Sequence, residues 1–234
     1  MRYVVLASDY DGTLAHDGIV DVKTIQAVER LRATQRKFVL VTGRVVSDLL
    51  RTFSEASMCD CIVAENGAVL YDPKTKEERP LAGPPPQEFI QAMLQRKVEP
   101  LEIGKVIVAT VQPYEHMVME LIRELGLELQ VIFNKGAVMI LPSGINKASG
   151  LAVALKEMGY SLEQVVGIGD AENDHAFLSA CGFSVAVSNS VEALKKTANY
   201  VSSEDHGRGV VEIIKCMIRS DLQELEHLVS KKVR

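Results

Sequence analysis

A run of apolar residues that ends on two aspartates constrains this chain more than any other feature. Residues 3–7 read Tyr-Val-Val-Leu-Ala, and Asp9-Tyr10-Asp11-Gly12-Thr13 closes the run. A short apolar run of this kind predicts a buried strand, and buried parallel strands of an α/β sheet end at a ligand crevice. Side chains two apart on a strand point to the same side. Asp9 and Asp11 are therefore expected to face one pocket.

Two carboxylates that are this close repel each other unless a cation lies between them. The pair is interpreted either as oxygen ligands for a hard divalent metal or as a nucleophile beside a general acid and base. The alternative is a solvated turn, because Asp-Gly is common turn chemistry. A calcium-binding loop is excluded, because it needs Asp or Asn at position 13 and Gly at position 14, where the chain has Thr13 and Leu14.

Strand-like and helix-like runs alternate at both ends of the chain, which predicts a parallel sheet with right-handed crossovers. Near the N-terminus the pattern gives strands at 3–7, 37–42 and 60–64, with helices at 22–32 and 45–53 between them. After residue 144 it gives a helix at 147–158, a strand at 165–169, a helix at 174–180, a strand at 183–187 and a last helix from near Gly209. The predicted fold class is α/β, with a Rossmann-like parallel sheet core.

The middle of the chain follows a different order. A hairpin is expected over 69–81, and Gly83-Pro84-Pro85-Pro86 is a stiff, extended linker. Beyond it, a helix (87–97), a strand (106–111), a helix (114–125) and two strands (129–133 and 137–141) predict a small inserted α+β module. The predicted domains are a core of residues 1–82 and 143–220, the insert 83–142 and a C-terminal helical tail, 221–234.

The tail is interpreted as a solvated terminal helix; a dimer seam or a connector to a further domain are the alternatives. Both a monomer and a homodimer stay open. Lys and Arg number 26 against 31 Asp and Glu, a net charge of −5, which argues against a nucleic-acid partner. No apolar stretch reaches membrane-spanning length, and the four cysteines form no metal-ligand pattern. A cytoplasmic protein with no membrane partner is expected.

A second carboxylate group is expected at the same edge of the sheet. The loop 167–174, Gly-Ile-Gly-Asp-Ala-Glu-Asn-Asp, follows a strand and precedes a helix, so Asp170 and Asp174 can add oxygens to the Asp9 and Asp11 site. Mg²⁺ prefers such ligands, and without a His/Cys cluster zinc does not fit. The alternatives are a helix-start carboxylate for Asp174 and a turn residue for Asp170.

Two further strand-end segments indicate an anion site. Thr42-Gly43-Arg44 places a hydroxyl and free backbone N–H groups at a helix start, although Thr42 can also be a simple helix cap. Lys147 begins a predicted helix, where a cation is unfavourable for the helix dipole, so it is expected to face an anion; the alternative is an ordinary solvated lysine. Carboxylates, a hydroxyl and an ammonium together predict metal-assisted phosphoryl transfer.

In this order the motifs resemble the four motifs of the haloacid dehalogenase-like phosphohydrolases, and the layout resembles the Cof-type branch, which carries an α/β cap between its second and third motifs. The resemblance implies that Asp9 is the nucleophile and forms an aspartyl-phosphate. It implies that Asp11 protonates the leaving oxygen and then activates water. It also implies a Mg²⁺ cofactor bound by Asp9, the backbone carbonyl of Asp11 and Asp170, with Asp174 in support.

The same resemblance implies roles for residues around the phosphate. Phosphoryl contacts are expected from Thr42, Gly43, Lys147 and Asn173. Leaving-group contacts are expected from Arg44 and Asn66. Arg208 stands where the branch often has a plainer Asp-Gly-Val, and with His206 it can either reach the site as a leaving-group contact or only pair with an acidic surface.

The expected function is a Mg²⁺-dependent phosphatase acting on a small phosphorylated metabolite. A cap of about 60 residues is short for this branch and implies a compact leaving group. The archaeal-type phosphoglycolate phosphatases have a similarly small cap, and sugar phosphates also fit. A phosphotransferase or phosphomutase is the close alternative, and a phospholigand-sensing module is the alternative from another class.

Overall fold

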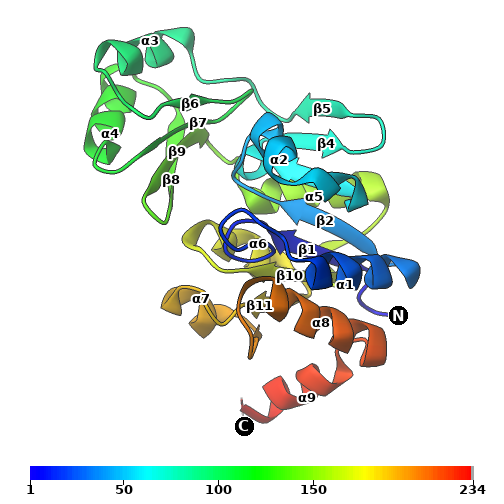
Figure 1. The fold of residues 1–234 in the computed structure, drawn as a ribbon. Coiled ribbons are helices and arrows are strands. Elements are labelled where there is room, and N and C mark those ends of the chain that lie inside the picture. The colour runs from blue at the N-terminus through cyan, green and yellow to red at the C-terminus, as the bar shows by residue number, and fades with distance from the viewer. Residues whose placement is uncertain (233–234) are drawn as a thin grey trace.

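The computed structural model describes residues 1–232 and contains two sheets. The main sheet has eight strands in the order β12-β11-β10-β1-β2-β3-β4-β5, and the second has four in the order β6-β7-β9-β8 (Figure 1). In this sheet order the neighbouring strands from β12 through β3 pair in parallel, whereas β4 and β5 extend the sheet with antiparallel pairs. The predicted α/β class with a parallel core is confirmed.

The N-terminal part of the main sheet follows the predicted order, with small shifts at element ends. It contains β1 (Val5–Asp9), α1 (Val22–Ala33), β2 (Lys37–Val41), α2 (Val46–Thr52), β3 (Cys61–Ala64), β4 (Val69–Asp72) and β5 (Glu77–Pro80). Short 3₁₀ turns at Ser54–Met58 and Glu65–Gly67 flank β3. The predicted hairpin over 69–81 is the β4–β5 pair.

The C-terminal part also keeps the predicted order, but two short elements were not expected. It contains α5 (Lys147–Met158), β10 (Val165–Gly169), α6 (His175–Ala180), β11 (Phe183–Ala186), α7 (Glu192–Thr197), β12 (Tyr200–Val201), α8 (His206–Ser220) and α9 (Gln223–Lys232). The sequence analysis missed α7 and β12, and it placed the start of α8 near Gly209 rather than at His206. Asp174 closes a 3₁₀ turn (Glu172–Asp174) and precedes α6.

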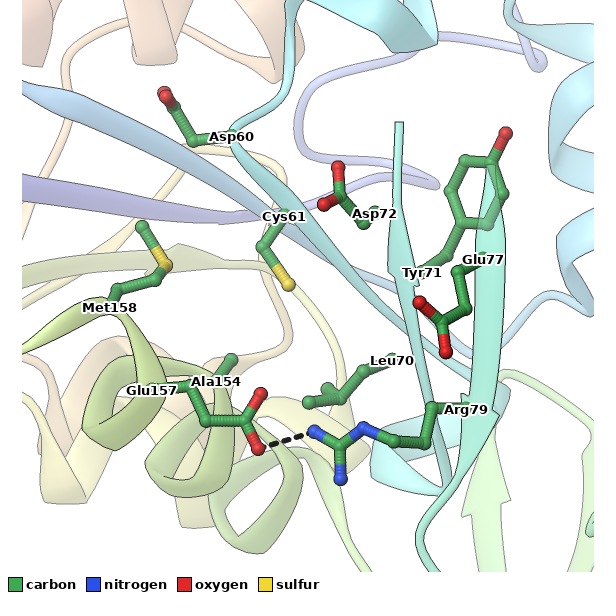
Figure 2. Close-up of a pocket in the computed structure, with 10 residues that line it drawn as sticks. All are labelled: Asp60, Cys61, Leu70, Tyr71, Asp72, Glu77, Arg79, Ala154, Glu157 and Met158. Carbon is green, nitrogen blue, oxygen red and sulfur yellow. Dashed lines mark hydrogen bonds and ion pairs between the residues drawn. The ribbon is translucent and has the colours of Figure 1, made fainter. Parts of the chain in front are cut away.

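A hollow of about 270 Å³ lies at the N-terminal edge of the parallel strands (Figure 2). Cys61 at the start of β3 and Met158 at the end of α5 line it, and Arg79 of β5 forms an ion pair across it with Glu157. Ligands of parallel α/β sheets bind at the opposite edge, where the strands end. The hollow is therefore on the edge away from Asp9.

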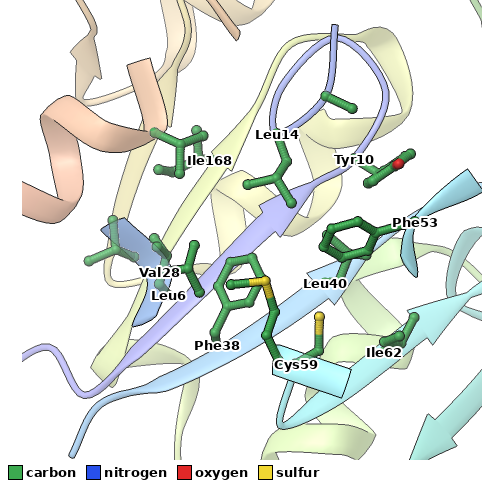
Figure 3. Packing of buried hydrophobic residues seen from close by; sticks show 14 of the residues in the cluster. Leu6, Tyr10, Leu14, Val28, Phe38, Leu40, Phe53, Cys59, Ile62 and Ile168 are labelled. Carbon is green, nitrogen blue, oxygen red and sulfur yellow. The ribbon is translucent and has the colours of Figure 1, made fainter. Parts of the chain in front are cut away.

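Helices cover both faces of the main sheet, which is why its central strands are apolar on both sides. Leu6 of β1 packs in the cluster beneath α1 and α8, together with Phe38 and Ile168 (Figure 3). Its neighbours Val5 and Ala7 point to the other face and pack with α5 and α6. Strand β1 is fully buried and hydrogen-bonded on both sides, by β2 and β10. This fixes Asp9 at its end.

The second sheet belongs to a small module with its own apolar cluster. Its elements are α3 (Gln87–Gln95), β6 (Glu102–Ile103), β7 (Val108–Val111), α4 (Glu115–Glu124), β8 (Leu129–Asn134) and β9 (Ala137–Pro142). Phe89, Val118 and Ile140 lie at the centre of the cluster between the helices and the sheet. The sequence analysis missed β6 and began β7 too early, because residues 105–107 form a loop. The domain boundaries at 83 and 142 stay a prediction.

Glu65, in the 3₁₀ turn after β3, joins the small module to the main sheet. Its carboxylate is buried and accepts the backbone N–H groups of Lys105 at 2.9 Å, Val106 at 2.8 Å and Ile107 at 2.9 Å. Its own N–H donates to the carbonyl of Arg44 at 2.9 Å. One side chain therefore holds the loop before β7 against the segment that follows β2.

The tail is not a solvated helix along its whole length, so that interpretation was wrong. Leu222 and Leu225 are buried in the main cluster, and Asp221 accepts a hydrogen bond from Arg36 at 2.9 Å. Tyr3 donates its hydroxyl to Glu226 at 2.7 Å. The N-terminal half of α9 is thus part of the core packing; the last two residues of the predicted tail lie outside the described residues. Within 1–232 no helix is long and apolar enough to cross a membrane.

Replacing Glu65 by alanine is expected to lower the free energy of unfolding by at least about 2 kcal/mol, because buried backbone donors lose a charged acceptor. Urea unfolding measures the change. Glu29→Ala, an exposed position on α1, is the matched control and should change stability by less than about 0.5 kcal/mol. Equal stabilities for the two variants would contradict this account of the Glu65 contact.

Candidate active site

The C-terminal ends of three neighbouring strands and the start of one helix meet at one edge of the main sheet. Asp9 ends β1, Asp170 follows β10, and these strands pair in parallel. Thr42 follows β2, on the other side of β1. Lys147 begins α5, the helix that enters the core after the small module. The right-handed crossovers of a parallel sheet bring these segments together although up to 161 positions separate them.

Three carboxylates form the buried centre of this edge. Ligand atoms of Asp9, Asp170 and Asp174 lie within 4.8 Å of one another, and all three residues are buried. Asp174 also closes its own loop, because its Oδ2 accepts the N–H groups of Asp170 at 2.8 Å and Ala171 at 3.0 Å. The hydroxyl of Thr13 donates to Asp170 Oδ1 at 2.7 Å.

Lys147 provides a positive charge that partly balances these carboxylates. Its side chain is 1% exposed, and its Nζ lies 2.6 Å from Asp9 Oδ1 and 2.5 Å from Asp174 Oδ1. Burial by itself would lower the pKa of Lys147, but the Asp174 and Asp9 carboxylates outweigh it and hold the pKa above its usual value. Asn146 caps α5 through a capping box with Ser149, which orients the helix start.

The charge of the cluster fits a divalent cation. Burial raises the pKa of Asp9 well above its usual range, the Asp174 carboxylate raises it further, and the Lys147 ammonium opposes both. A buried group of three carboxylates is stable in its ionised form only with added positive charge. The donors are all oxygens, which suits Mg²⁺ better than zinc.

Asp11 does not join this cluster through its side chain. Its carboxylate is 43% exposed and forms a two-point ion pair with Arg44, with Nε–Oδ2 and Nη2–Oδ1 distances of 2.7 Å. The hydrogen bonds and the charge of Asp11 raise the pKa of Arg44 above its usual value. Arg44 also contacts Asp48 at 2.6 Å, and its backbone N–H donates to Thr42 Oγ1 at 3.1 Å.

Two buried amides lie beside Gly43, in the segment that follows β2. Asn173 donates its Nδ2 to Asn66 Oδ1 at 3.0 Å, while Asn66 Nδ2 and Asn173 Oδ1 have no hydrogen-bond partner within residues 1–232. A Cβ added to Gly43 would lie 3.9 Å from Asn173 Nδ2. Because buried polar atoms are seldom left unpaired, the two amides indicate a ligand contact next to Gly43.

Gly67 lets the Asn66 turn approach the start of α5. Its φ is +104°, and a Cβ there would lie 1.9 Å from the carbonyl oxygen of Asn146. Only glycine fits this backbone conformation at this separation. The turn therefore fixes Asn66 relative to Lys147.

A cavity of about 230 Å³ opens onto these residues between the two sheets. It is bounded on the main-sheet side by the aspartates and by Gly43 and Arg44, and on the module side by the ends of β6 to β9. The lining residues are Asp9, Asp11, Gly43, Arg44, Pro100, Glu102, Ala109, Thr110, Val111, Asn134, Ala137 and Met139. This volume admits only a compact molecule.

Arg208 does not lie at the cavity that Asp9 lines. Its side chain is 69% exposed and pairs with Asp205 at 2.6 Å and Glu204 at 3.6 Å, and it lines a different cavity near His16 and His206. The structure therefore does not bring Arg208 to the cavity that holds Asp9.

Lys135 of the small module, in contrast, reaches the cluster although the sequence analysis did not single it out. Its Nζ forms an ion pair with Asp170 Oδ2. A lysine in a hairpin turn has the sequence signature of a solvated residue, so no local signal could have shown this contact. Thr13, which lies inside the first motif, also has a contact that the sequence analysis did not assign.

Comparisons with known proteins agree with the geometry. A family model of the haloacid dehalogenase-like hydrolases matches residues 6–101 and 85–214. The phosphoglycolate phosphatase of Methanothermobacter thermautotrophicus is 32% identical over 224 residues, which cover 90% of this chain and 96% of the relative. The Sulfolobus acidocaldarius phosphoglycolate phosphatase is 30% identical, over 94% of this chain and 99% of the relative.

A solved haloacid dehalogenase-like hydrolase from Bacteroides thetaiotaomicron has the same fold, with a TM-score of 0.78 at 21% identity over 92% of this chain and 99% of that one. The chain belongs to the haloacid dehalogenase-like hydrolase family. Its predicted class, a phosphoric monoester hydrolase of this family, is confirmed.

Divalent metal binding is expected to compete with protonation of Asp9. The pKa of Asp9 in the folded protein is raised above its unfolded value of about 4. Between these two pKa values the folded metal-free protein keeps a proton that the unfolded chain loses. The stability of the metal-free protein therefore falls as pH rises from the unfolded pKa through the folded pKa. Metal ions bind the ionised carboxylate. The rise in Tm at a fixed Mg²⁺ concentration should therefore be larger at about pH 8 than at about pH 5.

Differential scanning fluorimetry measures this shift, and EDTA should reverse it. Asp9→Asn removes the titrating ligand and is the control, because its smaller Mg²⁺ shift should lose most of the pH dependence. A wild-type shift that is the same at both pH values would contradict the competition.

Proposed function

We propose that this protein is a Mg²⁺-dependent phosphatase that hydrolyses a small phosphorylated metabolite, phosphoglycolate or a sugar phosphate, through an aspartyl-phosphate. The observation that carries the proposal is the buried set of Asp9, Asp170 and Asp174 with Lys147, of which Asp9 lines the cavity of about 230 Å³. This arrangement supplies a nucleophile and concentrated positive charge at one point, as phosphoryl transfer requires.

Asp9 acts as the nucleophile in this proposal. Lys147 holds its Oδ1, so the side chain is fixed before substrate arrives. The carboxylate forms a bond to phosphorus while the bond from phosphorus to the leaving oxygen breaks, and Asp11 donates a proton to that oxygen. Asp11 then takes a proton from water, which attacks phosphorus and releases Asp9 with inorganic phosphate.

The pair between Asp11 and Arg44 sets a condition on the first step. Arg44 donates to both carboxylate oxygens of Asp11, so this contact must open before Asp11 can reach the leaving oxygen. Arg44 lines the cavity where the leaving group lies. A leaving group that engages Arg44 therefore frees Asp11 in the same event.

The remaining residues hold the metal and the phosphoryl group. Mg²⁺, held by Asp9, Asp170 and the backbone carbonyl of Asp11 with support from Asp174, would supply positive charge that screens the phosphoryl oxygens from Asp9. Thr42, the N–H of Gly43 and Lys147 would bind those oxygens. The unpaired Nδ2 of Asn66 would donate a further hydrogen bond to those oxygens, and Asn173 would orient Asn66 by donating its own Nδ2 to Asn66 Oδ1.

The small module acts as a cap in this proposal. Residues 83–142 would cover the core made of 1–82 and 143–220, exclude bulk water and contact the leaving group through Glu102 and Met139. The relatives that cover more than nine-tenths of this chain are named phosphoglycolate phosphatases, and the guanidinium of Arg44 suits a carboxylate on the leaving group. Both observations support phosphoglycolate within the proposed substrate class.

Hydrolysis of a generic aryl phosphate tests the chemistry. Turnover is expected with Mg²⁺ and not with EDTA, and Asp9→Asn should lower kcat by at least about a thousandfold because it removes the nucleophile. Circular dichroism confirms that the variant is folded. Turnover by folded Asp9→Asn at the wild-type rate would refute the proposed intermediate, and transfer of phosphate to a sugar hydroxyl rather than to water would indicate a transferase.

The Arg44→Met variant tests the leaving-group contact. We expect kcat/KM for phosphoglycolate to fall roughly 10- to 100-fold more than for the aryl phosphate, because a charged hydrogen bond to the carboxylate is lost. The loss of the Asp11 partner affects both substrates, so only the difference between them reports on the leaving group.

Arg51→Met is the matched control, since Arg51 contacts the same Asp48 at 2.9 Å but its side chain is 77% exposed. It should change neither substrate by more than about twofold. Equal losses for both substrates in Arg44→Met would show that Arg44 does not read the leaving group.

A further inference from the structure

The tip of the β8–β9 hairpin brings a cation from the small module into the acidic cluster. Asn134 and Ala137 pair at the hairpin end, so Lys135 and Gly136 form a two-residue turn. Both have positive φ, +45° and +89°, as in the primed turns that match the twist of hairpin strands. A short, defined turn of this kind fixes the direction in which Lys135 leaves the backbone.

Lys135 and a metal ion would need the same carboxylate oxygen. Asp170 is fully buried, its Oδ1 accepts the Thr13 hydroxyl at 2.7 Å, and its Oδ2 forms the ion pair with Lys135 Nζ. A Cβ added to Gly12 would lie 2.7 Å from that Nζ, so the ammonium lies directly against the loop of the first motif. Both oxygens of Asp170 are thus engaged.

The formal charge of the cluster favours a bound divalent cation with Lys135 withdrawn over a bound divalent cation with both lysines in place. Asp9, Asp170 and Asp174 carry −3 when ionised, and Lys147 with Lys135 carries +2, which leaves −1. A divalent cation added beside both lysines would bring the cluster to +1, whereas the same cation with Lys135 withdrawn brings it to zero. Lys147 is buried and held by two carboxylates, but the side chain of Lys135 is 47% exposed and is the cation that can move into water.

We propose that Lys135 is a counter-charge that a divalent metal displaces from Asp170, so that metal loading releases the hairpin tip and its ammonium for an anionic substrate. This inference rests on the proposed metal-dependent phosphatase function. The neighbours of Lys135 on both sides, Asn134 and Ala137, line the cavity. The released ammonium therefore stays at the cavity mouth, and metal binding precedes productive substrate binding.

Because of thermodynamic linkage, the displacement can be tested both through metal affinity and through the mobility of the hairpin. If Lys135 and the metal exclude each other at Asp170, removing Lys135 must tighten metal binding, and metal binding must loosen the hairpin by the same free energy. Neither effect requires substrate, so both can be measured apart from turnover.

Isothermal titration of the full chain with MgCl₂ alone, at constant ionic strength, is the first test. For Lys135→Asn the Mg²⁺ dissociation constant should fall at least about threefold, because a like charge next to the ion is gone. Asparagine tolerates positive φ, so the turn is retained. Lys135→Arg keeps the charge and should bind Mg²⁺ as the wild type does.

Lys97→Asn is the matched control. Lys97 is an exposed lysine with a φ of +56°, and it lies in the same module, after α3. The substitution removes the same net charge from the same module, so a general electrostatic effect would appear in both variants. Its Mg²⁺ affinity should stay within about 1.5-fold of the wild type.

Hydrogen exchange gives the reciprocal test. In the wild type, Mg²⁺ without substrate should speed amide exchange at residues 133–137, and in Lys135→Asn exchange there should already be fast and insensitive to Mg²⁺. With substrate, Lys135→Asn should raise KM for phosphoglycolate several-fold while kcat changes little. A purely structural role of the turn would not produce this separation.

Three results would overturn the inference. Weaker or unchanged Mg²⁺ binding in Lys135→Asn, with a wild type that binds Mg²⁺ and turns over, would refute the displacement and leave the proposed function intact. Slower hairpin exchange on adding Mg²⁺ would mean that the metal and Lys135 cooperate. Absence of Mg²⁺ binding in all variants would overturn both this inference and the proposed function.

Discussion

The structure depends on one electrostatic balance, in which the buried carboxylates of Asp9 and Asp174 contact the buried ammonium of Lys147 and the carboxylate of Asp170 lies beside them. Charges of one sign at such distances would force the core open without that partner. Lys147 is placed by the capped start of α5, and Asp9 by a strand that is hydrogen-bonded on both sides. The stability of the core and the chemistry of the site therefore rest on the same contacts.

The turn after β3 connects this balance to the rest of the molecule. The backbone N–H groups of Glu65 and Asn66 donate to the carbonyls of Arg44 and Thr42, both at 2.9 Å, and Gly67 packs against the start of α5. The Glu65 carboxylate holds the loop that leads into β7. This one turn thus fixes the segment that follows β2, the start of α5 and the small module relative to one another.

The predicted order of elements in the main sheet was right, because apolar periodicity and turn residues act over short distances. The predictions were wrong where contacts between residues far apart in the sequence determine the structure. Strand β7 is shorter than predicted because residues 105–107 give their N–H groups to Glu65. The tail is buried in part because Leu222 and Leu225 find space beside α8, which no local pattern shows.

Local sequence patterns are enough to predict the parallel core, the carboxylates and hydroxyl at its strand ends and the lysine at a helix start, because each motif is local and the crossover rules allow few arrangements. Which of these side chains meet depends on how the elements pack. This packing pairs Asp11 with Arg44, leaves Arg208 on the surface and brings Lys135 from a hairpin turn to Asp170. The Asp11–Arg44 and Lys135–Asp170 contacts join residues 33 and 35 positions apart, and their geometry comes from packing between elements, which residue spacing along the chain does not encode.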